Sequence, residues 1–132
     1  MMIIGDVVAA TGLPAKTIRY YESAGLIDPP ARSAGNYRVY DERQLATLRF
    51  IHQARQLGFS VKEVAALVAL WRDKHRASAD VRRLATAHLQ QVDERIAELN
   101  RMRRTLQRLI DHCHGDHRPD CPILDELAEM RD

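Results

Sequence analysis

Residues 14–40, PAKTIRYYESAGLIDPPARSAGNYRVY, decide the fold of this chain. The first part of the stretch predicts a short helix with one apolar face and one polar face. The inward positions are Ile18, Tyr21 and Leu26. The outward positions are Lys16, Arg19 and Tyr20. A preceding helix ends near Thr11 and Gly12, so two short helices joined by a glycine-containing turn predict a helix-turn-helix.

The second part of the stretch predicts a β-hairpin. Paired prolines end the helix, and Gly35-Asn36 supplies a turn between residues of β character. Arg32 and Arg38 flank that turn, so the hairpin is basic. A basic hairpin after a helix-turn-helix is typical of a winged DNA-binding domain, in which the wing grips phosphates.

Two further amphipathic helices are expected at residues 41–57 and 60–73. Each begins with the spacing of a capping box, Asp41 with Gln44 and Ser60 with Glu63. The apolar positions assigned to the core are Leu45, Leu48, Ile51, Ala54, Val64, Leu67, Val68 and Trp71.

A long helix is expected from about Ala79 to Asp111. Its apolar positions step by alternating fours and threes, which is a coiled-coil seam interrupted only by Arg103. The seam comprises Ala85, Leu89, Val92, Ile96, Leu99, Arg103, Leu106 and Ile110. At ~1.5 Å per residue such a helix is roughly 50 Å long, too long to pack on so small a domain. The pattern therefore predicts a homodimer.

Composition and charge narrow the class of protein. No stretch approaches the ~20 apolar residues that cross a bilayer, and the N-terminus has no basic segment typical of a signal peptide, so a cytoplasmic protein is expected. Residues 1–76 hold eleven Lys and Arg against seven Asp and Glu, which favours a polyanionic partner. No nucleophile elbow, phosphate loop or metalloprotease motif is present, so the sequence does not predict an enzyme.

The segment at residues 110–130, IDHCHGDHRPDCPILDELAEM, carries the remaining chemistry. Cys113 and Cys121 bound a loop, and Pro122 suits the first turn of a helix whose N-terminus favours a thiolate at Cys121. Two thiolates without a third are the donor set of a linear two-coordinate ion such as Cu(I), Ag(I) or Au(I). Two alternatives stay open, a regulatory disulfide and a Zn(II) site completed by histidines. Those histidines are His112, His114 and His117.

Nearly the whole chain resembles the MerR family of transcription regulators, and within it the copper-efflux group. The resemblance rests on Tyr-Tyr-Glu followed by Gly-Leu, on a Gly-x-Tyr-Arg-x-Tyr wing at residues 35–40, and on the C-x-G-D-x₃-D-C-P-I loop from Cys113. It implies a mainly α fold: a winged helix-turn-helix domain at residues 1–76, an antiparallel coiled-coil dimerisation helix at 77–111 and a metal-binding loop and helix at 112–132.

The resemblance also implies residue roles and partners. Lys16, Arg19 and Tyr20 would lie on the recognition helix, Tyr37 and Arg38 on the wing, and Arg55 would support contact with the DNA backbone. The dimer would bind promoter DNA with an overlong spacer and distort it, so that RNA polymerase engages both of its recognition elements.

Metal selectivity is implied at Ser78. Family members that sense divalent ions usually carry a cysteine where the dimerisation helix opens, and this cysteine reaches the partner's metal loop. Ser78 occupies that position here, which is similar to the pattern of the sensors of monovalent ions. A hydroxyl is no soft ligand, so Zn(II) or Hg(II) would lack a third thiolate. The expected ligand is therefore Cu(I), held by Cys113 and Cys121.

Overall fold

The computed structural model describes residues 2–130. Residues 1, 131 and 132 lie outside the described residues. Residue 1 belongs to the predicted segment 1–76, and residues 131 and 132 belong to the predicted segment 112–132. The chain forms two compact units, residues 1–84 and residues 85–132. The prediction of a mainly α fold is confirmed, since two short strands are the only sheet among the described residues.

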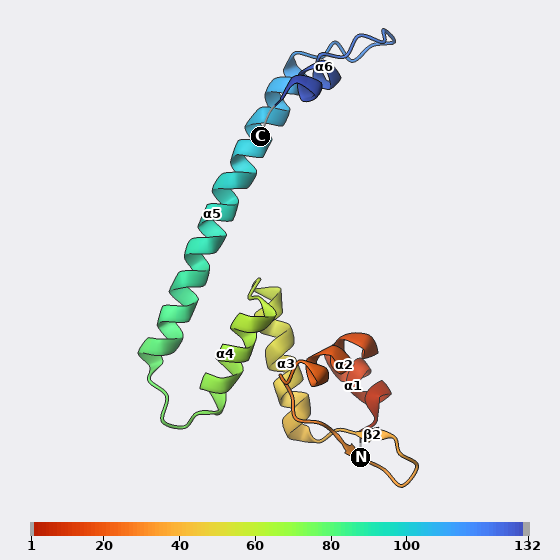
Figure 1. Ribbon diagram of the computed structural model, residues 1–132, viewed down its shortest axis with the longest axis vertical. Coiled ribbons are helices and arrows are strands. Elements are labelled where there is room, and N and C mark those ends of the chain that lie inside the picture. The colour runs from red at the N-terminus through yellow and green to blue at the C-terminus, as the bar shows by residue number, and fades with distance from the viewer. Residues whose placement is uncertain (1, 131–132) are drawn as a thin grey trace. The chain divides into compact units, whose positions relative to one another are not determined.

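The first unit follows the predicted order of helices and hairpin (Figure 1). Its elements are α1 (Ile4–Thr11), α2 (Ala15–Ser23), β1 (Ala31–Arg32), β2 (Arg38–Val39), α3 (Glu42–Gln56) and α4 (Val61–Arg72). The two strands are antiparallel, with Ala31 opposite Val39 and Arg32 opposite Arg38. A winged helix-turn-helix is thus formed within this unit.

Both predicted capping boxes are present and set where α3 and α4 begin. The Gln44 amide donates to Oδ1 of Asp41 at 2.7 Å, and the Asp41 amide donates to Oε1 of Gln44 at 2.9 Å. Ser60 and Glu63 repeat the arrangement at 3.1 Å and 2.8 Å. Each box satisfies backbone amides that have no partner within the helix.

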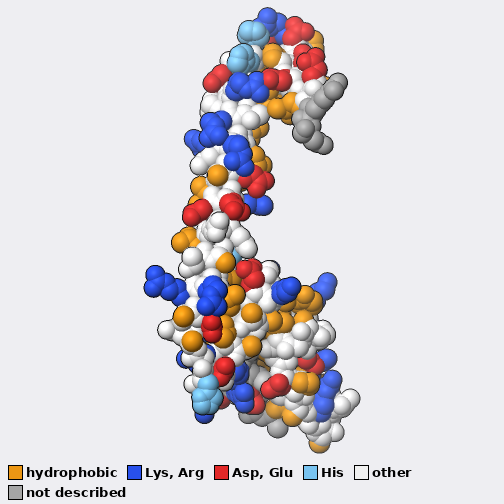
Figure 2. Space-filling model, turned by 60° about the vertical axis from the view of Figure 1, so that its left-hand side comes forward, with side chains coloured by type: hydrophobic (Ala, Val, Ile, Leu, Met, Phe, Trp, Pro, Cys, Tyr) orange, Lys and Arg blue, Asp and Glu red, His pale blue; other side chains and the backbone are white. Residues whose placement is uncertain are grey.

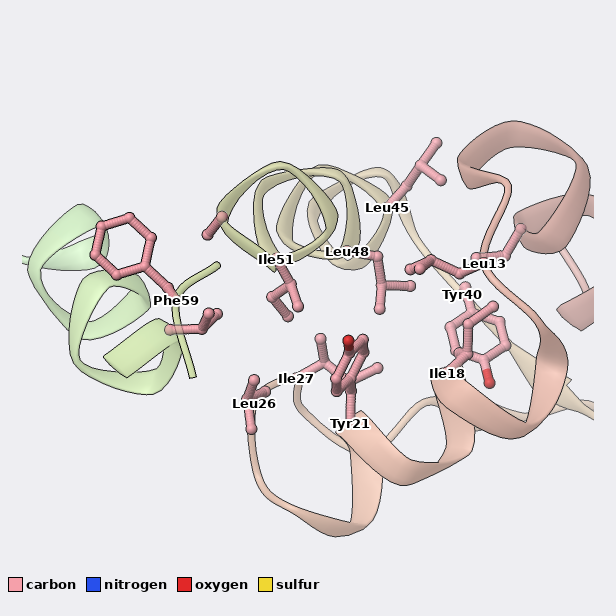
Figure 3. Packing of buried hydrophobic residues seen from close by; sticks show 13 residues of the cluster. Leu13, Ile18, Tyr21, Leu26, Ile27, Tyr40, Leu45, Leu48, Ile51 and Phe59 are labelled. Atoms are coloured by element: carbon pink, nitrogen blue, oxygen red, sulfur yellow. The ribbon is translucent and has the colours of Figure 1, made fainter. Parts of the chain in front are cut away.

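The core of the first unit is formed by side chains of α1, α2, α3 and α4 and of the segments between these helices (Figure 3). Val7, Ile18, Leu48 and Ile51 are fully buried. The assignment of Trp71 to the core is wrong, because 39% of its surface is exposed. In the last turn of α4 its ring stacks on Phe50, with centroids 4.4 Å apart, and so lies outside the main cluster.

The second unit consists of most of α5 and the short helix α6 (Pro122–Glu129). Helix α5 runs from Ser78 to Asp111, beginning one residue before the expected start. Large seam residues of α5 stay exposed within the chain; they are Leu89, Val92, Ile96, Leu99, Leu106 and Ile110. Within residues 2–130, no helix is both long and apolar enough to cross a membrane.

Removing the cap of α3 tests the assignment of Asp41. We expect Asp41→Ala to lower the free energy of unfolding by about 1 kcal/mol, because an amide at the helix start loses its acceptor. Asp41→Asn keeps an acceptor and should retain most of the stability. Glu42→Ala, one residue along, is the matched control. Urea denaturation measures all three, and an equal loss for Ala and Asn at position 41 would contradict the capping role.

Candidate DNA-binding face and metal loop

Helix α2 presents the predicted recognition residues on one face. Gly12 ends α1 in a left-handed conformation, with φ of 75°, and Leu13 is buried directly after it. This tight turn leads into α2, which buries Ile18 and Tyr21. The opposite face therefore exposes Lys16, Arg19 and Tyr20, as predicted.

The wing is closed by a compact turn between β1 and β2. The Ser33 amide donates to the Tyr37 carbonyl at 2.8 Å, and the Asn36 amide donates to the Ser33 carbonyl at 2.9 Å. Asn36 takes the left-handed conformation, with φ of 65°. A Cβ on Gly35 would lie 3.0 Å from the Tyr37 ring, so glycine allows this ring to lie close over the turn. Tyr37 is 71% exposed and free to meet a partner surface.

An ion pair joins the wing to the recognition helix. Nε of Arg38 lies 3.1 Å from Oε2 of Glu22, and both side chains are partly buried. The side chain of Tyr40 is buried nearby, and its hydroxyl finds no hydrogen-bond partner among the described residues. Burial raises the pKa of Tyr40, the Glu22 carboxylate adds to the rise, and the Arg38 guanidinium opposes it. Tyr40 therefore stays neutral at physiological pH.

A hollow opens between the start of α1, the face of α2 and the wing. Its volume is 340 Å³, and its lining combines three guanidinium groups with apolar side chains. The lining residues are Ile3, Ile4, Arg19, Arg32, Asn36, Tyr37 and Arg38. Guanidinium groups bind phosphate or guanine edges, whereas the apolar floor excludes water. The structure thus brings Arg19 of the helix and Arg38 of the wing to one concave surface.

Arg55 has a structural contact of its own. Its Nη1 donates to the Phe59 carbonyl at 2.7 Å and so ties the end of α3 to the turn before α4. Arg55 does not line the hollow. A contact between Arg55 and the DNA backbone stays a prediction.

The two cysteines lie at the two ends of a loop in the second unit. Helix α5 ends at Asp111, and the Cys113 amide still donates to the Ile110 carbonyl at 3.0 Å. Cys121 is the N-cap residue of α6, with Pro122 in the first turn, as predicted. Both thiols are free and partly exposed.

Polar contacts shape the loop between the cysteines. Arg118 donates to Asp116 from its backbone amide at 2.9 Å and from its guanidinium at 2.8 Å. These hydrogen bonds from Arg118 hold the pKa of Asp116 below its ordinary value. Arg108 of α5 pairs with Glu126 of α6 and holds the second helix against the first. The loop is therefore anchored at both ends on one small body.

The candidate metal donors near the loop are the two thiols and the neighbouring histidines. Among residues 2–130, no three His, Cys, Asp or Glu side chains are grouped closely enough to hold a metal. His112, which precedes Cys113, forms a hydrogen bond through its Nδ1 with the Arg108 carbonyl at 2.6 Å. Cys121 lies at the N-terminus of α6, where the helix dipole favours a thiolate.

Ser78 is the first residue of α5 and belongs to the first unit, whereas the cysteines belong to the second. Its predicted role concerns the loop of a partner chain and stays a prediction. Sequence reasoning missed Glu22, which was part of the Tyr-Tyr-Glu motif but received no role. The signal was an acidic residue on a basic face, followed by an arginine in the wing.

Comparison with known proteins gives matches along most of the chain. Residues 2–70 match the MerR HTH family regulatory proteins, and residues 45–109 match the family described as MerR, DNA binding. Heavy metal-dependent transcription regulator 2 of Rhizobium meliloti is 49% identical, over 96% of this chain and 86% of its own length. The regulator CueR of Salmonella typhimurium is 43% identical, over 96% and 92%.

A solved structure matches most of the chain. The transcription regulator PbrR691 of Ralstonia metallidurans, in complex with lead(II), superposes with a TM-score of 0.82. The match covers 96% of this chain and 99% of that chain at 35% identity.

Substitutions of Arg19 and Arg38 test whether the helix recognises bases while the wing contacts phosphates. We expect Arg19→Ala to weaken DNA binding and to reduce the preference for a specific site, because an arginine on base edges carries about 1–3 kcal/mol of discrimination. Arg38→Ala should weaken binding to all sequences and lower the salt dependence of the affinity. Fluorescence anisotropy at several salt concentrations measures both effects. Identical behaviour of the two variants would contradict a division between recognition helix and wing.

Proposed function

The chain belongs to the MerR family of DNA-binding transcription regulators, and from this premise we propose that it is a cytoplasmic homodimeric activator that responds to Cu(I). The observation that carries the metal assignment is the pair of free thiols at the two ends of one anchored loop. A family of DNA-binding regulators is not a family of enzymes.

Promoter DNA is the proposed partner of the first unit. Lys16, Arg19 and Tyr20 would meet the major groove, while Tyr37 and Arg38 on the wing would contact the backbone. Arg55 would strengthen backbone contact from the end of α3. The concave arrangement of Arg19 and Arg38 supports this division, since guanidinium groups from helix and wing line one hollow.

A second copy of the chain is the proposed partner of α5. Seam residues such as Leu89, Ile96 and Leu99 are each more than half exposed within a single chain. An antiparallel pair of α5 helices would bury these side chains, as coiled-coil seams do. A dimer would also present two recognition helices to the two halves of an operator.

Cu(I) is the proposed ligand, with Ag(I) and Au(I) as ions of the same chemistry. Cys113 and Cys121 would hold it, and the bound ion would join the two ends of the loop. Two thiolates and a +1 ion leave a single negative charge beside the start of α6. The heavy metal-dependent regulator and the lead(II)-bound regulator among the relatives support a soft-metal ligand.

Activation would act through the shape of the DNA. Bending promoter DNA costs a few kcal/mol, and contacts with the protein must offset this cost. A ligand shifts the balance between two dimer shapes only through unequal affinity for them. Ordering of the loop and α6 would favour the shape that distorts the promoter, and RNA polymerase would then engage both promoter elements.

Loss of either thiol tests the proposed ligand set. We expect Cys113→Ser and Cys121→Ser to abolish Cu(I)-dependent transcription in vitro, because each leaves a single soft donor. Operator affinity should stay within about twofold of the parent protein, since neither cysteine lies in the first unit. His114→Ala is the matched control in the same loop and should keep the response.

Anaerobic Cu(I) titration with X-ray absorption supplies the second measurement. A two-coordinate sulfur environment supports the proposal. A response that disappears under reductant alone would identify a disulfide switch instead.

Position 78 tests selectivity. We expect Ser78→Cys to add a third sulfur from the partner chain and to let Zn(II) or Hg(II) activate transcription. Ser78→Ala, which adds no donor, should show no such gain. Transcription from the operator, measured over a series of metals, is the readout. If the parent protein already responds to Zn(II), and alanine at the loop histidines removes this response, the monovalent assignment is wrong. Those histidines are His112, His114 and His117.

A further inference from the structure

Arg103 is the one charged residue in the seam of α5. The seven other seam positions are Ala, Leu, Val or Ile. Arg103 is exposed, and within the described residues it makes neither a hydrogen bond nor an ion pair. A charge placed in an apolar seam is costly once a partner helix covers it, unless the partner supplies an opposite charge. A carboxylate on the partner helix would offset this cost.

The spacing of the seam fixes how two antiparallel copies align. Facing positions in an antiparallel pair have residue numbers that add to a constant. One alignment alone places all eight seam positions opposite one another. It pairs Ala85 with Ile110, Leu89 with Leu106, Val92 with Arg103, and Ile96 with Leu99. The apolar area is then buried over the whole seam, which any other alignment leaves partly exposed.

In this alignment Arg103 inserts between four residues of the facing helix. Spacings of three and four around Val92 give these four as Leu89, Val92, Asp93 and Ile96. Asp93 is the only charged member, and it is exposed and has no ion pair within the described residues. Figure 2 shows acidic and basic side chains along the exposed length of α5.

We propose that Arg103 of one chain pairs with Asp93 of a second copy across the seam, twice in each dimer, and that these pairs set the antiparallel register. The inference rests on the proposed dimer. A parallel pairing in register would place two Arg103 side chains against each other. The charges thus disfavour the parallel alternative as well as supporting the antiparallel one.

Charge reversal in the full-length protein tests the pair. Arg103→Glu and Asp93→Lys should each raise the dimer dissociation constant by about a hundredfold, because each creates two contacts between like charges. The double variant restores opposite charges and should return to within about fivefold of the parent protein. Sedimentation equilibrium measures the constant without DNA or metal, and circular dichroism confirms that the helices remain.

The matched control reverses neighbouring charges that lie off the seam. Arg104→Glu and Glu94→Lys make the same changes one residue along and should each alter the constant less than about threefold. If the parent protein is a monomer, the proposed dimer itself fails and the pair with it. If the parent is a dimer but the double variant is no tighter than the single variants, the pair is overturned and the dimer stands.

Discussion

The exposed apolar stripe on α5 is the physical constraint on which much of the organisation of this protein depends. Leu89, Ile96 and Leu99 remain more than half exposed because no other helix within residues 2–130 is long enough to cover them. Burial of such side chains stabilises by about 25 cal/mol for each Å² removed from water. A single chain leaves this stabilisation unused. The exposed stripe on α5 is therefore the surface that the proposed dimer would bury.

A second dependence lies in the first unit, between Glu22 and Arg38. The wing has only two residues in each strand, too few to fix its orientation through backbone hydrogen bonds alone. The ion pair ties β2 to the end of α2, and the Tyr40 backbone adds a bridge to Met2. Helix and wing are thus positioned together, as a surface that meets both a groove and its phosphates must be.

Local rules predicted the first unit well, because its elements are specified by short-range chemistry. Capping boxes at Asp41 and Ser60 set the starts of α3 and α4, and Gly12 set the end of α1. Trp71 was misplaced because helical spacing alone does not tell a core from a ring that stacks on a neighbour. Glu22 was missed for a related reason: its partner lies 16 residues away, which no local pattern links to it. In the loop between the cysteines, the sequence located both thiols, whereas the Arg108–Glu126 pair that anchors α6 could be found only from the fold.

That anchoring bears on how the two thiols would compete with small cellular thiols for a metal ion. The Arg108–Glu126 pair joins α6 to α5, so Cys121 is less free to move away from Cys113 than it would be at the end of a free tail. At the proposed metal site, the second sulfur would meet an ion on the first at a high effective concentration, with part of the loop-closure entropy already spent when the protein folds. Small cellular thiols must meet an ion two at a time from dilute solution. At the proposed metal site, part of the chelate advantage would thus come from an ion pair that touches neither sulfur.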